Sequence, residues 1–226
     1  MAWECFMCNQ YVISDNQYFS IGVASLVPGQ TCVSLVPEDI TTGLKKLISG
    51  VVLIYIKDRN KFHDVCRCLF SSVCELIFFF DTPPGLEMNG FVSSRFLNAR
   101  ISVAVFRSKI PERLICNNDS LLNRISPARR QRLFAAAQGL EYFNFWVSER
   151  TVTPKGQHNY SRSLLQVLGI YNVSLHNLLL AEEIAQACVT VLKIQERQRR
   201  ALKKSECSDC PAGVIYKVKV PGHMNL

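Results

Sequence analysis

Apolar and polar residues in the first half of the chain alternate in blocks that predict strands and helices in turn. Continuous apolar runs rich in β-branched or aromatic residues, at 51–56 and 76–80, are typical of strands covered on both faces. Further strands are predicted at 19–27, 32–36 and 101–106, and helices at 37–48, 62–72 and 90–99. Strands that alternate with helices of about ten residues predict an α/β domain with a parallel sheet of the flavodoxin-like kind.

The pattern in the second half predicts helices alone. Ser126-Pro127 and Thr153-Pro154 each place a capping hydroxyl before a proline in the first helical turn. Gly139 and Gly169 mark the ends of these two helices. A longer helix is predicted from residue 172 or 174 through the basic stretch 193–204.

The helix that follows Thr153 is polar in its first turns and apolar in its last ones. Its leucines, Leu164, Leu165 and Leu168, cluster at the C-terminal end. Such a helix suits docking by its end with its first turns in the major groove of DNA, where Arg reads guanine and Asn or Gln reads adenine. A solvated amphipathic helix, whose polar residues contact only water, fits the same pattern.

The net charge of +8 lies entirely in the second half of the chain. Residues 1–120 hold 11 basic and 11 acidic residues, whereas residues 121–226 hold 15 basic and 7 acidic residues. This asymmetry predicts that the second half meets a polyanion such as nucleic acid.

The 10 cysteines are interpreted as reduced thiols, because many lie in apolar stretches and the first residues do not resemble a secretory signal. Two Cys-x-x-Cys pairs, Cys5/Cys8 and Cys207/Cys210, are about 200 residues apart and have no supporting His, so no metal site is expected. No apolar run reaches the about 20 residues of a membrane span. A cytoplasmic location without membrane contact is expected.

Two segments of the second half resemble the helix-turn-helix of LuxR/FixJ-type transcription regulators. Residues 125–133 (ISPARRQRL) and 137–140 (AQGL) resemble its opening, and residues 161–172 (SRSLLQVLGIYN) resemble the end of its recognition helix and the following turn. With a receiver-like region ahead of it, the whole chain resembles a degenerate response regulator, similar to enterobacterial Rcs-type auxiliary regulators. The resemblance implies a receiver-like, flavodoxin-like domain at 1–112, a linker at 113–124, an all-α, four-helix LuxR-type domain at 125–192 and a basic extension at 193–226.

The resemblance also implies which residues contact DNA and a partner. The recognition helix would be capped by Thr153 and would contact DNA through Lys155, Gln157, His158, Asn159 and Arg162. The dimerisation helix would carry Leu175, Leu178 and Leu179. The implied partners are double-stranded DNA and an Rcs-type response regulator as heterodimer partner, or a second copy of the chain, in the bacterial cytoplasm and at the nucleoid when bound.

Some residues depart from the family pattern. Arg129 stands where the family has Glu, and Tyr160 stands where His or Gln is common. Gly156 weakens the recognition helix by up to about 1 kcal/mol relative to Ala. The aromatic run 142–147 replaces a small, polar helix and fits a core or partner surface better than a base-stacking platform. These departures favour weakened autonomous DNA binding and reliance on a partner.

A phosphorylated receiver needs acidic residues after its first strand, an Asp at the end of the third, a hydroxyl after the fourth and a Lys after the fifth. With a first strand at 19–27, no carboxylate follows it, and Tyr55 stands near the phosphoacceptor position. Asp58 is interpreted as a turn carboxylate, and Thr82 and Lys109 lie where the last two groups belong. We therefore expect a protein that acts without aspartyl phosphate.

Three classes of function are compatible with these residues. The first is a DNA-binding regulator that pairs with a response regulator, and the second is a regulator that modulates a response regulator without contacting DNA. An enzyme has the least support, because the four histidines are scattered and no nucleophile elbow or phosphate loop is present. No catalytic residue and no cofactor is predicted.

Overall fold

A computed structural model describes residues 10–26, 32–42, 50–72, 74–83, 95–108, 125–137, 154–170 and 174–208. Within its helices, it describes the backbone alone at 154–158, 160–161 and 202–208. The predictions made for Lys109, for the aromatic run 142–147 and for the linker 113–124 lie outside the described residues.

Five parallel strands form one sheet, in the order β2-β1-β3-β4-β5. The strands are β1 (Gln10–Ser14), β2 (Cys32–Leu35), β3 (Val51–Tyr55), β4 (Glu75–Phe80) and β5 (Phe96–Asn98). The predicted α/β class with a parallel sheet is confirmed, and the strand order is compatible with a flavodoxin-like domain.

The predictions for β2, β3 and β4 are confirmed, and the predictions for the first and last strands are wrong. Most of 19–27 lies in helix α1 (Gln17–Leu26), and β1 precedes it. The stretch 96–98, predicted as the end of a helix, forms β5, and residues 103–108 are helical where a strand was predicted. Residues 19–26 and 103–106 of these apolar runs pack on one face of the sheet as helices, because packing overrides the weak local preference for a strand.

Strands β3 and β4 are buried on both faces, as their continuous apolar sequences predict. Their side chains alternate between two core clusters: Val52, Ile54, Leu76, Phe78 and Phe80 point to one face, and Val51, Leu53, Tyr55, Ile77 and Phe79 point to the other. Helix α1 and the helix at 103–108 cover the second face, where Phe19 and Phe106 contact the Phe79 ring at centroid distances of 5.2 and 6.1 Å.

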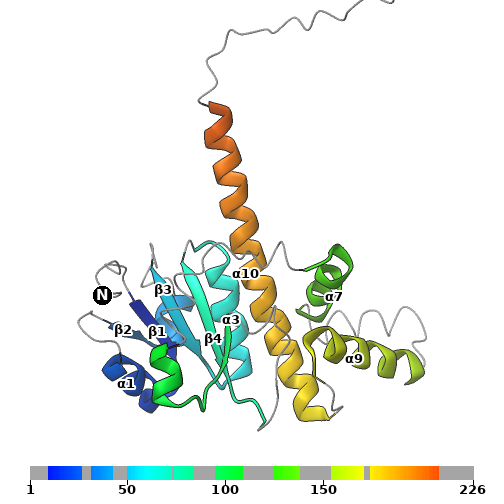
Figure 1. Cartoon of the computed structure of the whole chain (residues 1–226), viewed down its shortest axis with the longest axis horizontal. Helices are drawn as coiled ribbons and strands as arrows, with labels where there is room; N and C mark the ends of the chain where they lie inside the picture. The colour runs from blue at the N-terminus through cyan, green and yellow to red at the C-terminus, as the bar shows by residue number, and fades with distance from the viewer. Residues whose placement is uncertain are drawn as a thin grey trace, which may run out of the picture.

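Three helices of the described part of the chain cover the other face of the sheet, and one of them also contacts the helices that follow residue 125. These are α2 (Pro37–Thr41), α3 (Arg59–Leu69) and α10 (Leu175–Ser208). Helix α10 contacts α3 and β4 on one side and α7 (Pro127–Ala137) and α9 (Pro154–Leu168) on the other. Figure 1 shows α10 between the sheet and these two helices. One core cluster runs from the sheet through α10 into α7 and α9.

Polar contacts fix α10 against α3. Arg59 forms an ion pair with Glu182. The Lys193 ammonium lies 3.9 Å from the centre of the Phe70 ring, and Arg197 Nη1 donates to the Ser71 carbonyl at 3.1 Å. The first basic residues of the stretch 193–204 therefore hold α10 against the end of α3, and α10 runs past residue 192 without a break.

Residues Leu175–Ala201 are long and apolar enough to cross a membrane by length and composition alone, and they form the one such stretch in the described part of the chain. However, 67% of the most apolar window is buried inside the protein. This burial is typical of the core helix of a water-soluble fold.

The first prediction concerns Glu183, which lies beside the Arg59–Glu182 pair. Burial, and then the neighbouring Glu182 charge, raises the pKa of Glu183 to about 7, although Arg59 opposes the shift. The folded protein therefore binds more protons than the unfolded chain between about pH 4.5 and 7, so stability falls as the pH rises through this window. Glu183→Gln should remove this loss and, relative to wild type, stabilise the protein at about pH 8 by about 1–2 kcal/mol, a value reduced for partial solvent screening.

Urea denaturation at acidic and mildly alkaline pH measures this difference. Glu196→Gln is the control, because Glu196 lies on the same helix in an exposed pair with Arg200. The same pH dependence in wild type and Glu183→Gln would contradict the assignment.

The second prediction concerns two glycines with opposite roles. Gly22 lies inside α1, and a Cβ added there would meet nothing within 4 Å. Gly22→Ala should therefore raise the free energy of unfolding by about 0.5–1 kcal/mol. Gly169 has a φ of 78° at the end of α9, so Gly169→Ala should lower it by about 1–2 kcal/mol. Denaturation at low protein concentration measures both changes in the free energy of unfolding. A Gly22→Ala variant that is less stable than wild type would contradict the absence of neighbouring atoms around this position.

Candidate functional site

Helix α9 is anchored by its C-terminal end. Leu164, Leu165 and Leu168 are buried in the core shared with α7 and α10. The helix ends at Gly169, and Ile170 N–H donates back to the Leu165 carbonyl at 2.8 Å, which tucks the Ile170 side chain into the same core. In Figure 1 the N-terminal turns of α9 point away from α10 and the sheet. The polar-then-apolar pattern of the sequence thus corresponds to a helix held at one end.

Two of the five residues expected to contact DNA have described side chains, Asn159 and Arg162, and both are exposed. They are three positions apart and therefore lie on one face of the helix. The backbone of α9 places Lys155, Gln157 and His158 in its first turns, but their side chains lie outside the described residues. The structure thus places the backbone of all five candidates in the first three turns of α9 and shows Asn159 and Arg162 on one exposed face.

Helix α7 places basic side chains beside α9. Arg129 and Arg132 are exposed. Arg132 Nη1 donates to the Ser163 hydroxyl at 2.9 Å, directly next to Arg162 in the sequence. The Arg129 N–H donates to the Ser126 hydroxyl at 3.4 Å, so the predicted cap of α7 is present. The link from Arg132 to α9 was not predicted, because two residues 31 positions apart leave no spacing signal in a sequence.

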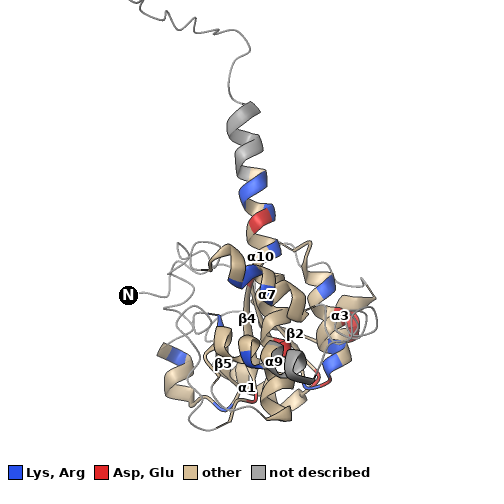
Figure 2. Cartoon of the chain, turned by 90° about the vertical axis from the view of Figure 1, so that its right-hand side faces the viewer, with Lys and Arg blue, Asp and Glu red and all other residues tan. Residues whose placement is uncertain are grey.

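The electrostatic character of α7 and α9 is uniform. All the charged residues in the described ranges 125–137 and 154–170 are Arg or Lys, namely Arg129, Arg130, Arg132, Lys155 and Arg162. Figure 2 shows further Lys and Arg along the projecting part of α10, where Glu196 pairs with Arg200. A helix that exposes Asn159 and Arg162 beside the Arg side chains of α7, without carboxylates in these ranges, can contact a polyanion.

The leucines expected in a dimerisation helix lie at the start of α10. Leu175 is 75% exposed. Leu178 and Leu179 are partly buried, and Leu178 packs against the core of this chain. Ser174 caps the helix by accepting from the Asn177 N–H at 3.1 Å. Of the three leucines, Leu175 alone is largely exposed to solvent.

The residues at the carboxyl edge of the sheet differ from the sequence prediction in one respect. Because the first strand is β1, Asp15 follows it directly, and the statement that no carboxylate follows the first strand is wrong. The Asp15 carboxylate accepts from the backbone N–H groups of Lys57 and Asp58, each at 2.9 Å. Asp58 in turn caps α3 by accepting from the N–H groups of Asn60 and Lys61 at 2.9 and 3.1 Å. The interpretation of Asp58 as a turn carboxylate is therefore confirmed.

A third carboxylate at this edge belongs to Asp81, which accepts from the Tyr55 hydroxyl at 2.9 Å. Lys57 and Arg100 lie 3.9 and 3.8 Å from its oxygens. Burial, and then the bond to Asp81, raises the pKa of Tyr55 far above its usual value. Thr82 is buried next to Asp81. All three carboxylates are thus engaged by groups of the chain itself.

The described residues include candidate metal ligands and several cysteines. They contain no group of three or more His, Cys, Asp or Glu side chains placed to hold a metal ion. The described cysteines, Cys32, Cys66, Cys68, Cys74 and Cys188, are free, and burial raises the pKa of the Cys66 thiol to about 12. Cys5, Cys8 and Cys210, and the Cys207 side chain, lie outside the described residues.

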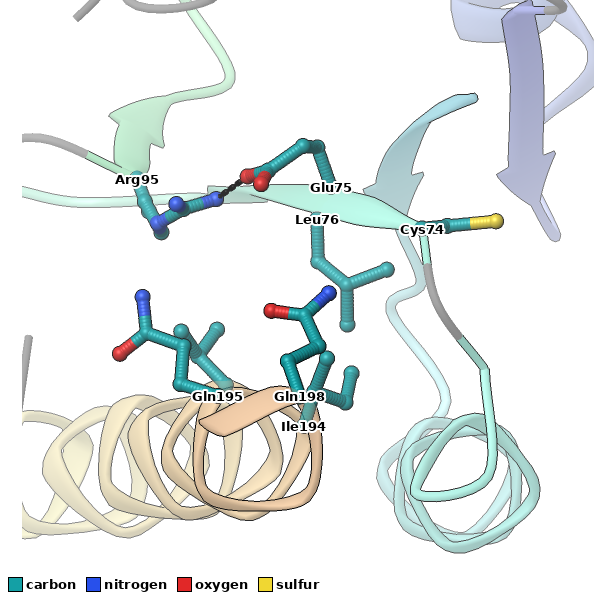
Figure 3. Close-up of a pocket in the computed structure, with 8 residues that line it drawn as sticks. Cys74, Glu75, Leu76, Arg95, Ile194, Gln195 and Gln198 are labelled. Carbon is teal, nitrogen blue, oxygen red and sulfur yellow. Dashed lines mark hydrogen bonds and ion pairs between the residues drawn. The ribbon is translucent and has the colours of Figure 1, made fainter. Parts of the chain in front are cut away.

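A small hollow lies where α10 crosses the amino ends of β4 and β5 (Figure 3). Arg95 and Glu75 form an ion pair on the sheet side, and Gln195 and Gln198 face them from α10. Its cavity volume is about 10 Å³, which is room for about one water molecule. We assign no ligand to it.

Comparison of the chain with protein-family models, curated proteins and solved structures gives no match. The functional proposal therefore rests on the residues of this chain.

The third prediction follows from the carboxyl edge. Incubation with acetyl phosphate and Mg²⁺ should leave the protein without a stoichiometric phosphoryl group, because Asp15, Asp58 and Asp81 are each engaged by donors of the chain. Intact-protein mass spectrometry measures this directly. A receiver domain with the full acidic pocket is the positive control, and one phosphoryl group on an Asp of this chain would refute the expectation.

Proposed function

We propose that this protein is a DNA-binding transcription regulator that places the first turns of α9 in the major groove. It acts without phosphorylation, as the auxiliary partner of a response regulator, in the bacterial cytoplasm. The observation that carries the proposal is the position of α9, which is anchored by Leu164, Leu165 and Leu168 while Asn159 and Arg162 are exposed on its free part.

The exposed side chains have the chemistry that base recognition needs. Arg162 can donate two hydrogen bonds to guanine, and Asn159 can pair with the donor and acceptor of adenine. Arg129 and Arg132 on α7 would lie over the phosphate backbone, which positions a protein on the duplex without reading its sequence. The absence of carboxylates from the described parts of α7 and α9 avoids repulsion by the phosphates.

The arrangement of the helices supports the resemblance to LuxR-type regulators. Helices α7, α9 and α10 would be the first, third and fourth helices of such a four-helix unit, and α7 and α9 contact each other and α10. The segment that would hold the second helix, 138–153, lies outside the described residues. A receiver-like origin of the first half is supported by the strand order of the sheet.

A second candidate is a regulator that binds a response regulator and does not contact DNA. It is favoured by Leu175, an apolar side chain that is 75% exposed at the start of the predicted dimerisation helix. The two candidate functions differ in whether substitutions on α9 change regulation by the protein.

The fourth prediction is salt-dependent binding of the full-length chain to promoter-derived duplex DNA, measured by fluorescence anisotropy. Arg162→Ala and Asn159→Ala should each weaken binding by about tenfold or more, since each removes a bidentate base contact. Arg162→Ala should also reduce the slope of log affinity against log salt by up to about 1. Arg67→Ala is the matched control, because Arg67 is an exposed arginine on α3 with Asp64 as its partner.

Addition of an Rcs-type response regulator should tighten the binding. Binding that is insensitive to both α9 substitutions, or absent at low salt with and without the partner, would reject the DNA-binding proposal. Regulation that survives Arg162→Ala and Asn159→Ala would then support the second candidate.

A further inference from the structure

A hydrogen bond between two side chains joins α7 to α9 at the protein surface. Arg132 Nη1 donates to the Ser163 hydroxyl at 2.9 Å, across 31 positions of sequence. Arg132 is exposed and Ser163 is half-buried. The two helices also share a buried apolar cluster, which includes Leu133 of α7 and Leu164 of α9. The contact between α7 and α9 therefore combines an apolar interior with a directed polar link near the surface.

These two kinds of contact constrain α9 in different ways. Burial of apolar side chains is non-directional, so it holds a helix in place but defines its rotation about its own axis less sharply. A hydrogen bond weakens steeply when its distance or angle changes. Because Arg132 is bound to the side of α9, this bond opposes rotation of the helix. An exposed hydrogen bond adds little to the stability of a fold, since water replaces it in the unfolded chain. Its main effect is thus on the orientation of α9.

Ser163 lies on the helix face that carries the candidate base contacts. Asn159 is four positions before Ser163, so the two residues lie one turn apart on the same side, and Arg162 directly precedes Ser163. Side chains on a helix surface lie about 5–6 Å from the helix axis, so a rotation of about 20° moves them by about 2 Å. A hydrogen bond does not survive such a displacement. The rotation of α9 therefore decides whether Asn159 and Arg162 can reach base edges.

We propose that Arg132 is a positioning residue for base recognition, which holds Ser163 and so fixes the rotation at which α9 presents Asn159 and Arg162. This inference rests on the DNA-binding function proposed above, and adds to it a residue that determines specificity without contacting a base. A guanidinium group has five N–H donors. Nη1 can therefore bind Ser163 while another nitrogen of Arg132 binds a phosphate oxygen. Arg132 then links the phosphate backbone of the duplex to the helix that reads its bases.

A purely electrostatic role for Arg132 would have a different effect on binding. A phosphate contact strengthens binding to every sequence alike, because phosphates carry no sequence information. A bond that positions base contacts strengthens binding to the preferred sequence more than to others. Ser163 separates the two roles, because Ser163→Ala removes the acceptor and leaves the Arg132 charge in place.

Fluorescence anisotropy of the full-length chain on two duplexes tests the positioning role. The wild-type chain selects one duplex from a random-sequence library, and the other duplex has the same base composition in scrambled order. Discrimination is the ratio of the two affinities. Ser163→Ala should lower this ratio about tenfold, as the loss of one bidentate base contact does, and should leave the slope of log affinity against log salt unchanged. A variant that only folds less well loses affinity for both duplexes equally, so its ratio stays at the wild-type value.

Two further variants separate the bond from the charge. Arg132→Ala should lower the ratio as much as Ser163→Ala and should also reduce the salt slope by about 1, because it removes a cation. The double variant should lower the ratio no further than either single variant, since both remove the same bond. Arg129→Ala is the matched control for charge, because Arg129 is exposed on the same helix three positions before Arg132. It should reduce the salt slope and leave the ratio at the wild-type value.

The possible failures of the inference and of the proposed function give different results. A wild-type ratio in Ser163→Ala, or an equal loss of ratio in Arg129→Ala, would overturn the positioning role and leave the DNA-binding function standing. A wild-type chain that binds DNA but selects no sequence from the library would also overturn the positioning role. A wild-type chain that binds neither duplex at low salt would reject the proposed function, and the inference with it.

Discussion

The burial of α10 is the constraint on which the two halves of the structure depend. Its apolar residues are shared by two sets of neighbours, with α3 and β4 on one side and α7 and α9 on the other. Residues such as Ile184, Ala185 and Cys188 are completely buried in a core that includes both sets. Removing α10 would expose one face of the sheet and the anchored end of α9 at once. The position of the candidate recognition helix is thus set by the same helix that completes the sheet domain.

The sequence predicted those parts of the fold in which local pattern and final packing agree. Strands β3 and β4 are continuous apolar runs, and they are buried on both faces. The caps Ser126 and Asp58 lie where their short polar side chains predicted turns or helix starts. The polar and apolar ends of α9 likewise correspond to its free and anchored ends. In each case a pattern within a few residues was sufficient.

The failures have physical causes of two kinds. Helix α1 was predicted as a strand because it has no charged residues, and without polar contrast an exposed helix resembles a buried strand. Strand β5 has three residues, too few for any periodicity. Contacts between residues far apart in the sequence produce no pattern that the local sequence can show. Tyr55 and Asp81 are 26 positions apart, and Arg132 and Ser163 are 31 positions apart.

The shared core has a consequence for how this chain can change over evolution. Many multidomain proteins are modular, and their domains tolerate exchange because few contacts cross the linker. Here α10 supplies apolar surface to both halves. Replacing the helical half, α10 included, by an unrelated domain would therefore expose apolar surface on the sheet, and replacing the sheet would expose apolar surface on α10. The two halves are expected to accumulate substitutions together and to be inherited as a single unit.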